Sequence, residues 1–285
     1  MPALRIRTQT AKSIFVASKI PDADFVANPY TGCQFGCLYC YAVFSCRFVQ
    51  EPRSAWGDFV VVKENAIELA KAQLARWPAR RREATIFLSS ITDPYQGIEK
   101  NRQLTRGILE ALVHAGYQGK VTILTKSPLV LRDIDLLQQL NSEVGLTITT
   151  TDDRLSRFLE VSAPLASKRL QTLQALHQAG LKTYAFVGPI FPHYVLQPQT
   201  LQSLFQAIAA SGTKEIYAEQ LNLNRTVRER LLQEFSISAP DQIALFQQAQ
   251  RHEHRDNLSA MVRSFAQQYN LYLRLGDAIY HRDVK

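Results

Sequence analysis

The sequence predicts an α/β fold in which six strands alternate with helical segments. Short stretches expected to form strands occur at 24–28, 85–88, 121–124, 144–149, 182–187 and 215–218. Segments with helical spacing of apolar residues occur at 64–77, 104–115, 127–140, 164–179 and 201–210. Alternating strand and helix units favour parallel strands joined by right-handed crossovers. Six units are too few for a closed eight-stranded barrel, so the pattern favours an open (β/α)6 partial barrel of the TIM type.

Local signals mark where individual elements begin and end. Gly116 and Gly180 follow two of the expected helices at the position of a C-terminal stop. Ser127 is suited to cap the helix of 127–140, with Pro128 at its first position. Each expected strand therefore ends in a loop that leads into a helix.

The segments outside the alternation divide the chain into three parts. Residues 1–23 show no clear period and are expected to form an N-terminal arm, and 24–224 would form the partial barrel. The stretch 41–57 is expected to be irregular, and 59–62 to be a short extended piece. After residue 225 the pattern changes to helices rich in Gln, Arg and Glu, with a late strand at 271–275. We expect 225–285 to be a mainly helical C-terminal extension packed on the barrel.

Composition limits the class of protein. With 285 residues, 46% of them hydrophobic, the chain can bury a substantial core. No apolar run approaches the roughly 20 residues of a membrane helix. The N-terminal stretch MPALRIRTQT lacks the apolar region of a signal peptide, so we expect a cytoplasmic protein and no membrane partner. The net charge of +8 is compatible with an anionic partner, although the only dense basic run is 80–82.

Three of the four cysteines form one closely spaced group. Cys33, Cys37 and Cys40 have the spacing C-x3-C-x2-C within NPYTGCQFGCLYCYA at 28–42. Thiolates at such spacing select iron–sulfur clusters, zinc or copper(I). Three cysteines suit a cubane cluster with one open iron position, whereas structural zinc needs a fourth ligand, which Cys46 or a histidine would have to supply. Four cysteines without a secretory signal argue against a disulfide framework.

This stretch resembles the cluster loop of the radical S-adenosylmethionine (SAM) superfamily. Together with SSITDPYQ at 89–96, it is similar to the spore photolyase-like branch, and the resemblance extends from about residue 25 to residue 224. It implies that Cys33, Cys37 and Cys40 bind a 4Fe–4S cluster whose open iron is chelated by SAM. It also implies an external electron donor of the flavodoxin or ferredoxin type. In this chemistry SAM is cleaved to methionine and a 5′-deoxyadenosyl radical, which abstracts hydrogen from a substrate.

The expected strand ends hold most of the unusual polar residues, and in βα barrels ligands meet those ends. Polar residues at strand ends also serve commonly as helix caps, so a single position carries little weight. By resemblance, one group would bind SAM: Ser89, Ser90 and Thr92 at the amino group, with Asp93 beside them, Lys126 at the carboxylate, and Thr149 and Thr151 at the ribose. Near the adenine the resemblance places Val187, Gly188, Pro189 and backbone next to Tyr39.

One departure from the photolyase pattern concerns the hydrogen donor. Spore photolyase returns hydrogen from a cysteine at the end of its second strand, where this chain has Ser90. A serine O–H bond is much stronger than a thiol S–H bond, so repair of a thymine dimer is not expected from this residue. Cys46 is an alternative donor, but it lies in the variable region after the cluster loop and is interpreted first as incidental. The tyrosines Tyr39, Tyr41 and Tyr95 are interpreted first as packing residues.

Three functions follow as hypotheses. The first is a radical SAM enzyme that acts on DNA or RNA, and the second is the same chemistry on a peptide or small metabolite. The third is a metal-stabilised nucleic-acid-binding protein without catalysis. Metal analysis separates the third from the other two, and nucleic-acid titrations with a salt series separate the first from the second.

Overall fold

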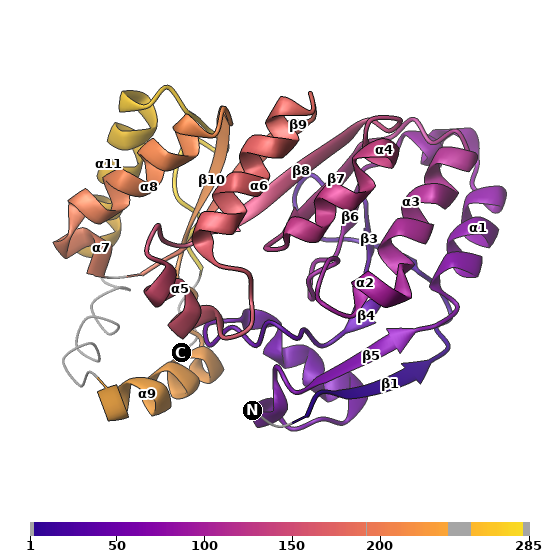
Figure 1. Cartoon of the computed structure of the whole chain (residues 1–285), viewed down its shortest axis with the longest axis horizontal. Coiled ribbons are helices and arrows are strands. Elements are labelled where there is room, and N and C mark those ends of the chain that lie inside the picture. The colour runs from indigo at the N-terminus through magenta and orange to yellow at the C-terminus, as the bar shows by residue number, and fades with distance from the viewer. Residues whose placement is uncertain (1–2, 192, 239–251, 282–285) are drawn as a thin grey trace. The chain divides into compact units, whose positions relative to one another are not determined.

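A computed structural model describes residues 3–191, 193–238 and 252–281 of the chain (Figure 1). The chain divides into two compact units. Unit 1 comprises Met1–Gly36, Ala42–Gly145 and Ala175–Lys182. Unit 2 comprises Cys37–Tyr41, Leu146–Gln174 and Thr183–Lys285. The division crosses the cysteine loop, so that its first cysteine counts with unit 1 and its second and third with unit 2.

The principal sheet of unit 1 is mainly parallel. Its strands follow the order β2 (Phe15–Ala17), β3 (Phe25–Ala27), β6 (Ile86–Leu88) and β7 (Val121–Thr125). The pairs β3–β6 and β6–β7 are parallel, whereas β2 runs antiparallel to β3. The parallel strands are the expected strands 24–28, 85–88 and 121–124.

A second, three-stranded sheet of unit 1 has the order β1 (Arg5–Gln9), β5 (Phe59–Lys63) and β4 (Tyr30–Thr31). Four apolar residues of β5 are buried, which explains why 59–62 is extended. β1 and β2 both lie in the expected N-terminal arm at 1–23, where the sequence pattern indicated no strand. All five β1 side chains are exposed, so the strand lacks the alternation of apolar and polar residues by which strands are detected.

Two helices of unit 1 follow the predicted periodicity. α1 (Ala66–Arg76) and α3 (Leu104–His114) pack side by side (Figure 1). The expected helix 127–140 is instead a 3₁₀ helix, η4 (Pro128–Asp133), followed by α4 (Ile134–Leu137). Ser127 caps it as expected, accepting a hydrogen bond from the Leu129 backbone at 3.2 Å. The remaining short helices are η1 (Tyr41–Val49), η2 (Arg53–Ala55), η3 (Ala79–Glu83) and α2 (Glu99–Arg102).

The sheet of unit 2 is parallel and includes β9 (Lys182–Ile190), β10 (Glu215–Gln220) and β11 (Tyr272–Leu273). β8 (Ser142–Ile148) contributes residues to both units. The strand expected at 182–187 continues through Gly188 and Pro189 to Ile190. The strand is longer because its pairing with β10 resumes after a register shift between Ala218 and Gln220.

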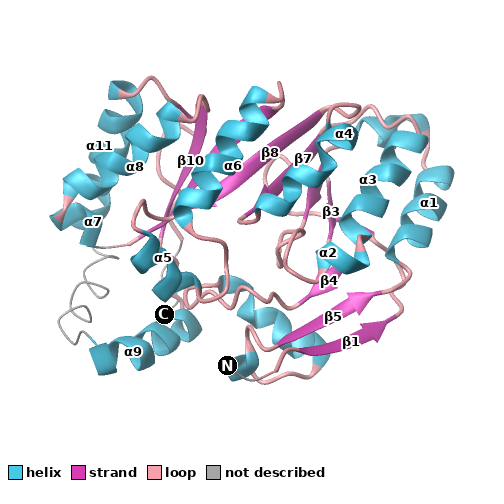
Figure 2. Cartoon of the chain, in the orientation of Figure 1, coloured by secondary structure: helices cyan, strands magenta, loops and turns pink. Residues whose placement is uncertain are grey.

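The helices of unit 2 include one that the sequence pattern did not indicate, α5 (Asp153–Glu160). The others are α6 (Ala166–Gln178), of which residues 175–178 count with unit 1, α7 (His193–Leu196), α8 (Pro198–Ala210), α9 (Arg225–Ser238) and α11 (His252–Gln268). α11 packs on α7 and α8 (Figure 2). Of the extension expected at 225–285, residues 239–251 and 282–285 lie outside the described part, and β11 joins the sheet beside β10.

The fold class is therefore the predicted one, a mixed α/β structure with a mainly parallel sheet, as in a partial TIM-type barrel. Within the described residues, no helix combines the length and the apolar character that a membrane crossing requires.

Candidate active site

The cysteine loop begins in unit 1 with a backbone that only glycine adopts readily. Gly32 has φ +86°, and a Cβ atom there would lie 2.6 Å from the carbonyl oxygen of Phe59. Gly36 has φ +62° and lies against Gly57, whose Cα would be 3.3 Å from an added Cβ. The loop therefore passes close to β5 and to a second loop, which fixes the path of the chain at Cys33.

The loop that follows β6 holds this first half of the cysteine loop in place. The Thr92 hydroxyl donates to the Gly32 carbonyl at 2.6 Å, and the Gln96 amide donates to the same oxygen at 3.3 Å. The Gln96 side chain also accepts from the Gln34 backbone N–H at 2.9 Å. Thr92, predicted to meet the SAM amino group, thus orders the backbone beside Cys33.

The second half of the cysteine loop belongs to unit 2 and is held there by separate contacts. The Leu38 backbone N–H donates to the Leu159 carbonyl at 2.9 Å, and Arg230 donates to the Cys37 carbonyl at 3.2 Å. The Tyr39 ring packs edge-on against Phe191, with 5.8 Å between the ring centroids. These contacts fix the backbone on both sides of Cys37.

The two predicted serines follow β6 in unit 1. Ser89 is buried with φ +67°, and its hydroxyl donates to the Ala27 carbonyl at 3.4 Å. The Asn28 amide donates to the Ser90 hydroxyl at 3.4 Å, and the Asn28 side-chain oxygen accepts from the Ile91 backbone at 3.2 Å. Asn28, the first residue of the NPYTGC motif, therefore positions the loop that carries both serines.

Asp93 organises the end of β7. One carboxylate oxygen accepts from the Thr125 hydroxyl at 2.6 Å and from the Tyr95 backbone at 2.9 Å, and the other accepts from the Lys126 backbone at 2.8 Å. Burial raises the pKa of the Asp93 carboxyl, although these hydrogen bonds oppose the shift. Asp93 thus fixes the backbone from which the Lys126 side chain projects.

In unit 2, the end of β8 carries a buried hydroxyl group without a hydrogen-bond partner in the described chain. Thr149 is only 2% exposed, and its Oγ1 atom has no such partner. Its carbonyl oxygen accepts from the buried Tyr194 hydroxyl at 2.5 Å. Thr151, the second predicted ribose contact, is exposed. The three residues predicted near adenine lie in β9 and are all buried: Val187, Gly188 and Pro189.

Comparison with known proteins identifies the family. The sequence profile of the radical SAM superfamily matches residues 27–203, which contain the cysteine loop and the ends of β6, β7, β8 and β9. The chain belongs to the radical SAM superfamily. It is also similar to uncharacterized proteins from other organisms. One, from Methanocaldococcus jannaschii, is 41% identical over 186 residues, or 65% of this chain and 67% of that protein. Another, from Mycobacterium tuberculosis, is 30% identical over 244 residues, or 82% of this chain and 71% of that protein.

This radical SAM protein shares its fold with spore photoproduct lyase. A complex of that enzyme with a dinucleoside spore photoproduct matches with a TM-score of 0.70 at 17% identity, over 96% of this chain and 82% of the other. A variant with bound SAM and the dinucleoside matches with the same TM-score over 94% of this chain. The expected photolyase-like fold is confirmed.

The donor set of the cysteine loop suits the cluster that a radical SAM family implies. None of the four cysteines is in a disulfide, and Cys33 and Cys37 are 8% and 6% exposed. Within the described residues, no three Cys, His, Asp or Glu side chains form a group that would hold a metal ion. A cubane cluster makes a different demand, because each thiolate binds its own iron. Three thiols on one glycine-containing loop meet that demand.

The Thr149 hydroxyl is the observation that fits SAM. A buried hydroxyl without a partner costs free energy unless a ligand or water satisfies it. In a radical SAM protein, a ribose hydroxyl is a suitable partner for a short polar side chain at a strand end. The residues present are therefore compatible with both the cluster and SAM.

The structure also reveals supporting residues that sequence reasoning missed. The Gln96 side chain accepts from the Gln34 backbone, and the Gln34 side chain accepts from the Ile98 backbone. Glu160 and Arg169 form a buried ion pair in unit 2. Arg169 offered one signal, since it stands on the same helical face as the buried Leu173 and Leu176. An arginine on an apolar stripe indicates a buried partner but does not name it.

Proposed function

We propose that this protein is a radical SAM enzyme in which Cys33, Cys37 and Cys40 bind a 4Fe–4S cluster and the neighbouring strand ends bind SAM. The observation that supports this proposal most directly is the three-cysteine loop itself, which lies within the matched family region and is held by β5 and the loop after β6. When bound, the cluster and SAM supply a 5′-deoxyadenosyl radical that abstracts hydrogen from the substrate.

The role of the chain's own residues is to bind and orient SAM and to exclude water. Lys126 would pair with the SAM carboxylate, and Asp93 supports that role by fixing the Lys126 backbone. The hydroxyls of Ser89 and Ser90 would accept from the SAM amino group. Thr149 would bind the ribose, while the buried residues 187–189 would form an apolar surface for the adenine.

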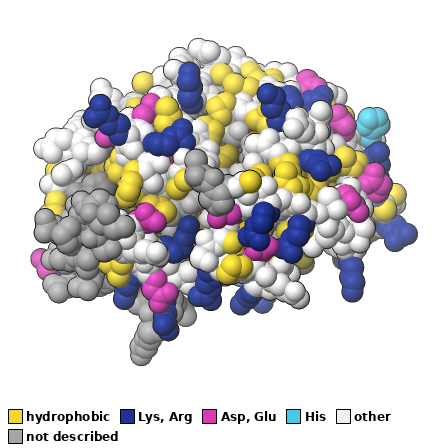
Figure 3. All heavy atoms as spheres, turned by 60° about the horizontal axis from the view of Figure 1, so that its bottom comes forward, with side chains coloured by type: hydrophobic (Ala, Val, Ile, Leu, Met, Phe, Trp, Pro, Cys, Tyr) yellow, Lys and Arg dark blue, Asp and Glu magenta, His cyan; other side chains and the backbone are white. Residues whose placement is uncertain are grey.

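For the substrate we propose a nucleic acid. The net charge of +8 favours an anionic partner, and spore photoproduct lyase, which shares the fold, has been crystallised with a dinucleoside photoproduct. The face in Figure 3 carries several separate groups of Lys and Arg side chains. Because Ser90 stands where spore photolyase has its donor cysteine, we do not propose repair of a thymine dimer with a thiol donor.

SAM cleavage tests the catalytic proposal. The protein is reconstituted anaerobically with iron and sulfide, reduced, and assayed for 5′-deoxyadenosine. Cys37→Ala should abolish the product, whereas Cys46→Ala, at a buried cysteine outside the motif, should retain it. Equal product from both variants would contradict the assignment. Zinc in place of iron and sulfide in the native protein would favour a metal-stabilised binding protein.

A binding titration tests the substrate class. Affinity for single-stranded and double-stranded DNA and RNA is measured over a salt series, because phosphate contacts give a linear fall of log K with log salt. A steep slope is expected. SAM cleavage without salt-dependent binding of any nucleic acid would favour a peptide or small metabolite as the substrate.

A further inference from the structure

Two tyrosines of the cysteine loop share an unusual environment. Tyr30 lies three residues before Cys33, and Tyr39 lies between Cys37 and Cys40. Each is buried, and each hydroxyl donates to a fully buried glutamate that is ion-paired with an arginine. One such Tyr–Glu–Arg set belongs to unit 1 and the other to unit 2.

The set in unit 2 joins Tyr39 to the Glu160–Arg169 pair. The side chains of Glu160 and Arg169 are both 0% exposed. Arg169 donates to Glu160 with two nitrogens, to the carbonyls of Pro164 at 2.8 Å and Thr147 at 3.1 Å, and to the Ser156 hydroxyl at 3.2 Å. Every donor direction of the guanidinium is therefore committed, so the carboxylate that receives the Tyr39 hydroxyl has little freedom to rotate.

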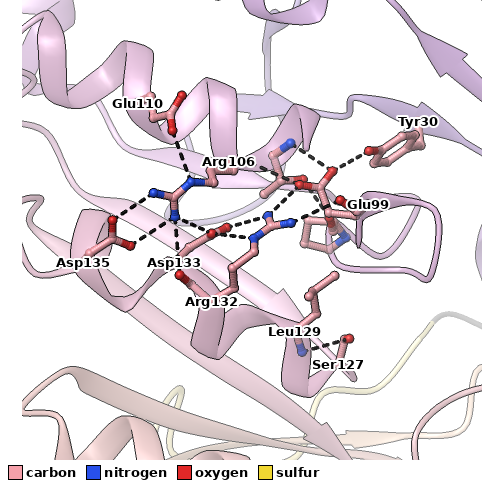
Figure 4. Close-up of polar contacts among 11 residues, drawn as sticks. Tyr30, Glu99, Arg106, Glu110, Ser127, Leu129, Arg132, Asp133 and Asp135 are labelled. Carbon is pink, nitrogen blue, oxygen red and sulfur yellow. Dashed lines mark hydrogen bonds and ion pairs between the residues drawn. The ribbon is translucent and has the colours of Figure 1, made fainter. Parts of the chain in front are cut away.

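The set in unit 1 joins Tyr30 to the Glu99–Arg132 pair (Figure 4). Glu99 is 0% exposed, and Arg132 donates to its carboxylate at 2.9 Å and to its carbonyl at 3.2 Å. The backbone N–H groups of Thr105 and Arg106 donate to the same carboxylate at 3.1 and 3.3 Å. The acceptor of the Tyr30 hydroxyl is thus fixed from several sides.

The hydrogen bonds within the cysteine loop are long. The Gly36 N–H reaches the Cys33 carbonyl at 3.3 Å, and the Cys40 N–H reaches the Cys37 carbonyl at 3.2 Å, both at the long end of the usual range. Phenylalanine would fill the space of either tyrosine ring. The hydroxyl groups therefore add little packing, and their use is to join the loop to buried charges.

We propose that the two Tyr–Glu–Arg sets are positioning devices that hold the three thiols ready for the cluster. Tyr30 sets the backbone leading to Cys33, and Tyr39 sets the backbone from which Cys37 and Cys40 project. The cluster part of this inference rests on the proposed function, whereas the ordering of the thiols does not. Residues that orient metal ligands act through the ligands they hold, and their loss typically reduces metal affinity about 10–100-fold.

The test compares Tyr39→Phe and Tyr30→Phe with the matched control Tyr117→Phe. Tyr117 is also a buried tyrosine whose hydroxyl donates to a carbonyl, that of Ala84, and its ring packs on Trp77; both partners lie outside the cysteine loop. The first readout is the alkylation rate of each cysteine in the apoprotein, mapped by mass spectrometry. The second is the rate of iron loss to a chelator after reconstitution, with the electron paramagnetic resonance (EPR) spectrum of the reduced cluster.

The expected pattern is specific to each variant. Tyr39→Phe should raise alkylation at Cys37 and Cys40 about tenfold, and Tyr30→Phe should do the same at Cys33, because a hydrogen bond to a charged group is lost. Both should lose iron about 10–100-fold faster and give a broadened EPR spectrum. Tyr117→Phe should leave the alkylation rates, the iron-loss rate and the EPR spectrum unchanged, even if it lowers the melting temperature as much as the other two variants do.

Two results have distinct meanings. Alkylation and iron-loss rates in the tyrosine variants equal to those of the control would overturn the positioning role. A parent protein that assembles no iron–sulfur cluster, while the variants still show the alkylation pattern, would refute the proposed function and support the ordering of the thiols.

Discussion

Removing the buried arginine of unit 2 is the perturbation whose effect follows most directly from the structure. In Arg169→Met, the methionine fills much of the same space but donates no hydrogen bonds. Glu160 would keep a carboxylate that is 0% exposed and has lost its counter-ion. The carbonyls of Pro164 and Thr147 would lose donors at 2.8 and 3.1 Å.

The magnitude follows from the cost of an unpaired buried charge. Breaking a buried ion pair from one side typically costs about 3–5 kcal/mol. At about 2–4 °C per kcal/mol for a chain of this size, Arg169→Met should lower the melting temperature by roughly 6–20 °C. Replacing both partners by apolar residues, as in Arg169→Met with Glu160→Leu, should recover part of the loss, because no charge is then buried, while the Tyr39 hydroxyl and the two carbonyls stay without their partners.

The assay is thermal and urea-induced unfolding of the reduced apoprotein, followed by circular dichroism; the first gives the melting temperature and the second the free energy of unfolding. The matched control is Arg263→Met, which breaks the 2.8 Å ion pair between Arg263 and Asp277. The two side chains of this pair are 53% and 43% exposed. An exposed pair contributes at most about 1 kcal/mol. Equal losses in Arg169→Met and Arg263→Met would refute the reasoning, as would a double variant no more stable than Arg169→Met alone.

Three further predictions concern the candidate site. Gly32→Ala should cost more than about 2 kcal/mol, because the added Cβ would lie 2.6 Å from a backbone oxygen of β5. The control is Gly116→Ala, because Gly116 has φ +60° but an added Cβ there would meet no atom within 4 Å, so this variant shows only the backbone strain of about 1–2 kcal/mol. Equal losses of melting temperature in Gly32→Ala and Gly116→Ala would contradict the steric argument. Because burial raises the pKa of Asp93, its charge costs stability above the folded-state pKa and nothing below the unfolded-state pKa. The parent should therefore lose stability relative to Asp93→Asn as the pH rises from about 4 to 7 in urea titrations, and a gain would show that the sign is wrong. Thr149→Val should raise the free energy of unfolding by about 1 kcal/mol, since a buried hydroxyl without a described partner is removed, and should weaken SAM binding in equilibrium dialysis. The control is Ser45→Ala, which removes another buried hydroxyl without a described partner and should raise the stability without changing SAM affinity. Unchanged SAM affinity in Thr149→Val would exclude Thr149 from the SAM site.

The sequence predicted those features of the fold that depend on residues close together along the chain. Apolar runs indicated the parallel strands, and the cysteine spacing with its glycines indicated the loop. It missed β1 (Arg5–Gln9), because a strand with five exposed side chains has no alternation to detect. It also ended β9 early, since the pairing that extends it depends on a register shift in β10.

The supporting residues of the site were beyond local reasoning for a different reason. The Tyr39 hydroxyl and its Glu160 acceptor are 121 residues apart, and Tyr30 and Glu99 are 69 apart. A pattern of nearby residues contains no information about such pairs. A single buried arginine or glutamate indicates that a partner exists, but only the fold identifies it.

The nature of these distant contacts bears on why they are present. A buried ion pair is seldom more stabilising than apolar residues of the same volume, so stability alone would favour leucine or methionine at Glu160 and Arg169. Apolar side chains would hold the Tyr39 ring as well, but they would not fix its hydroxyl. A charged acceptor held by a committed guanidinium fixes both the distance and the direction of one hydrogen bond. The presence of this arrangement on both halves of the cysteine loop, at Tyr30 and at Tyr39, therefore favours control of loop geometry over stability as its purpose.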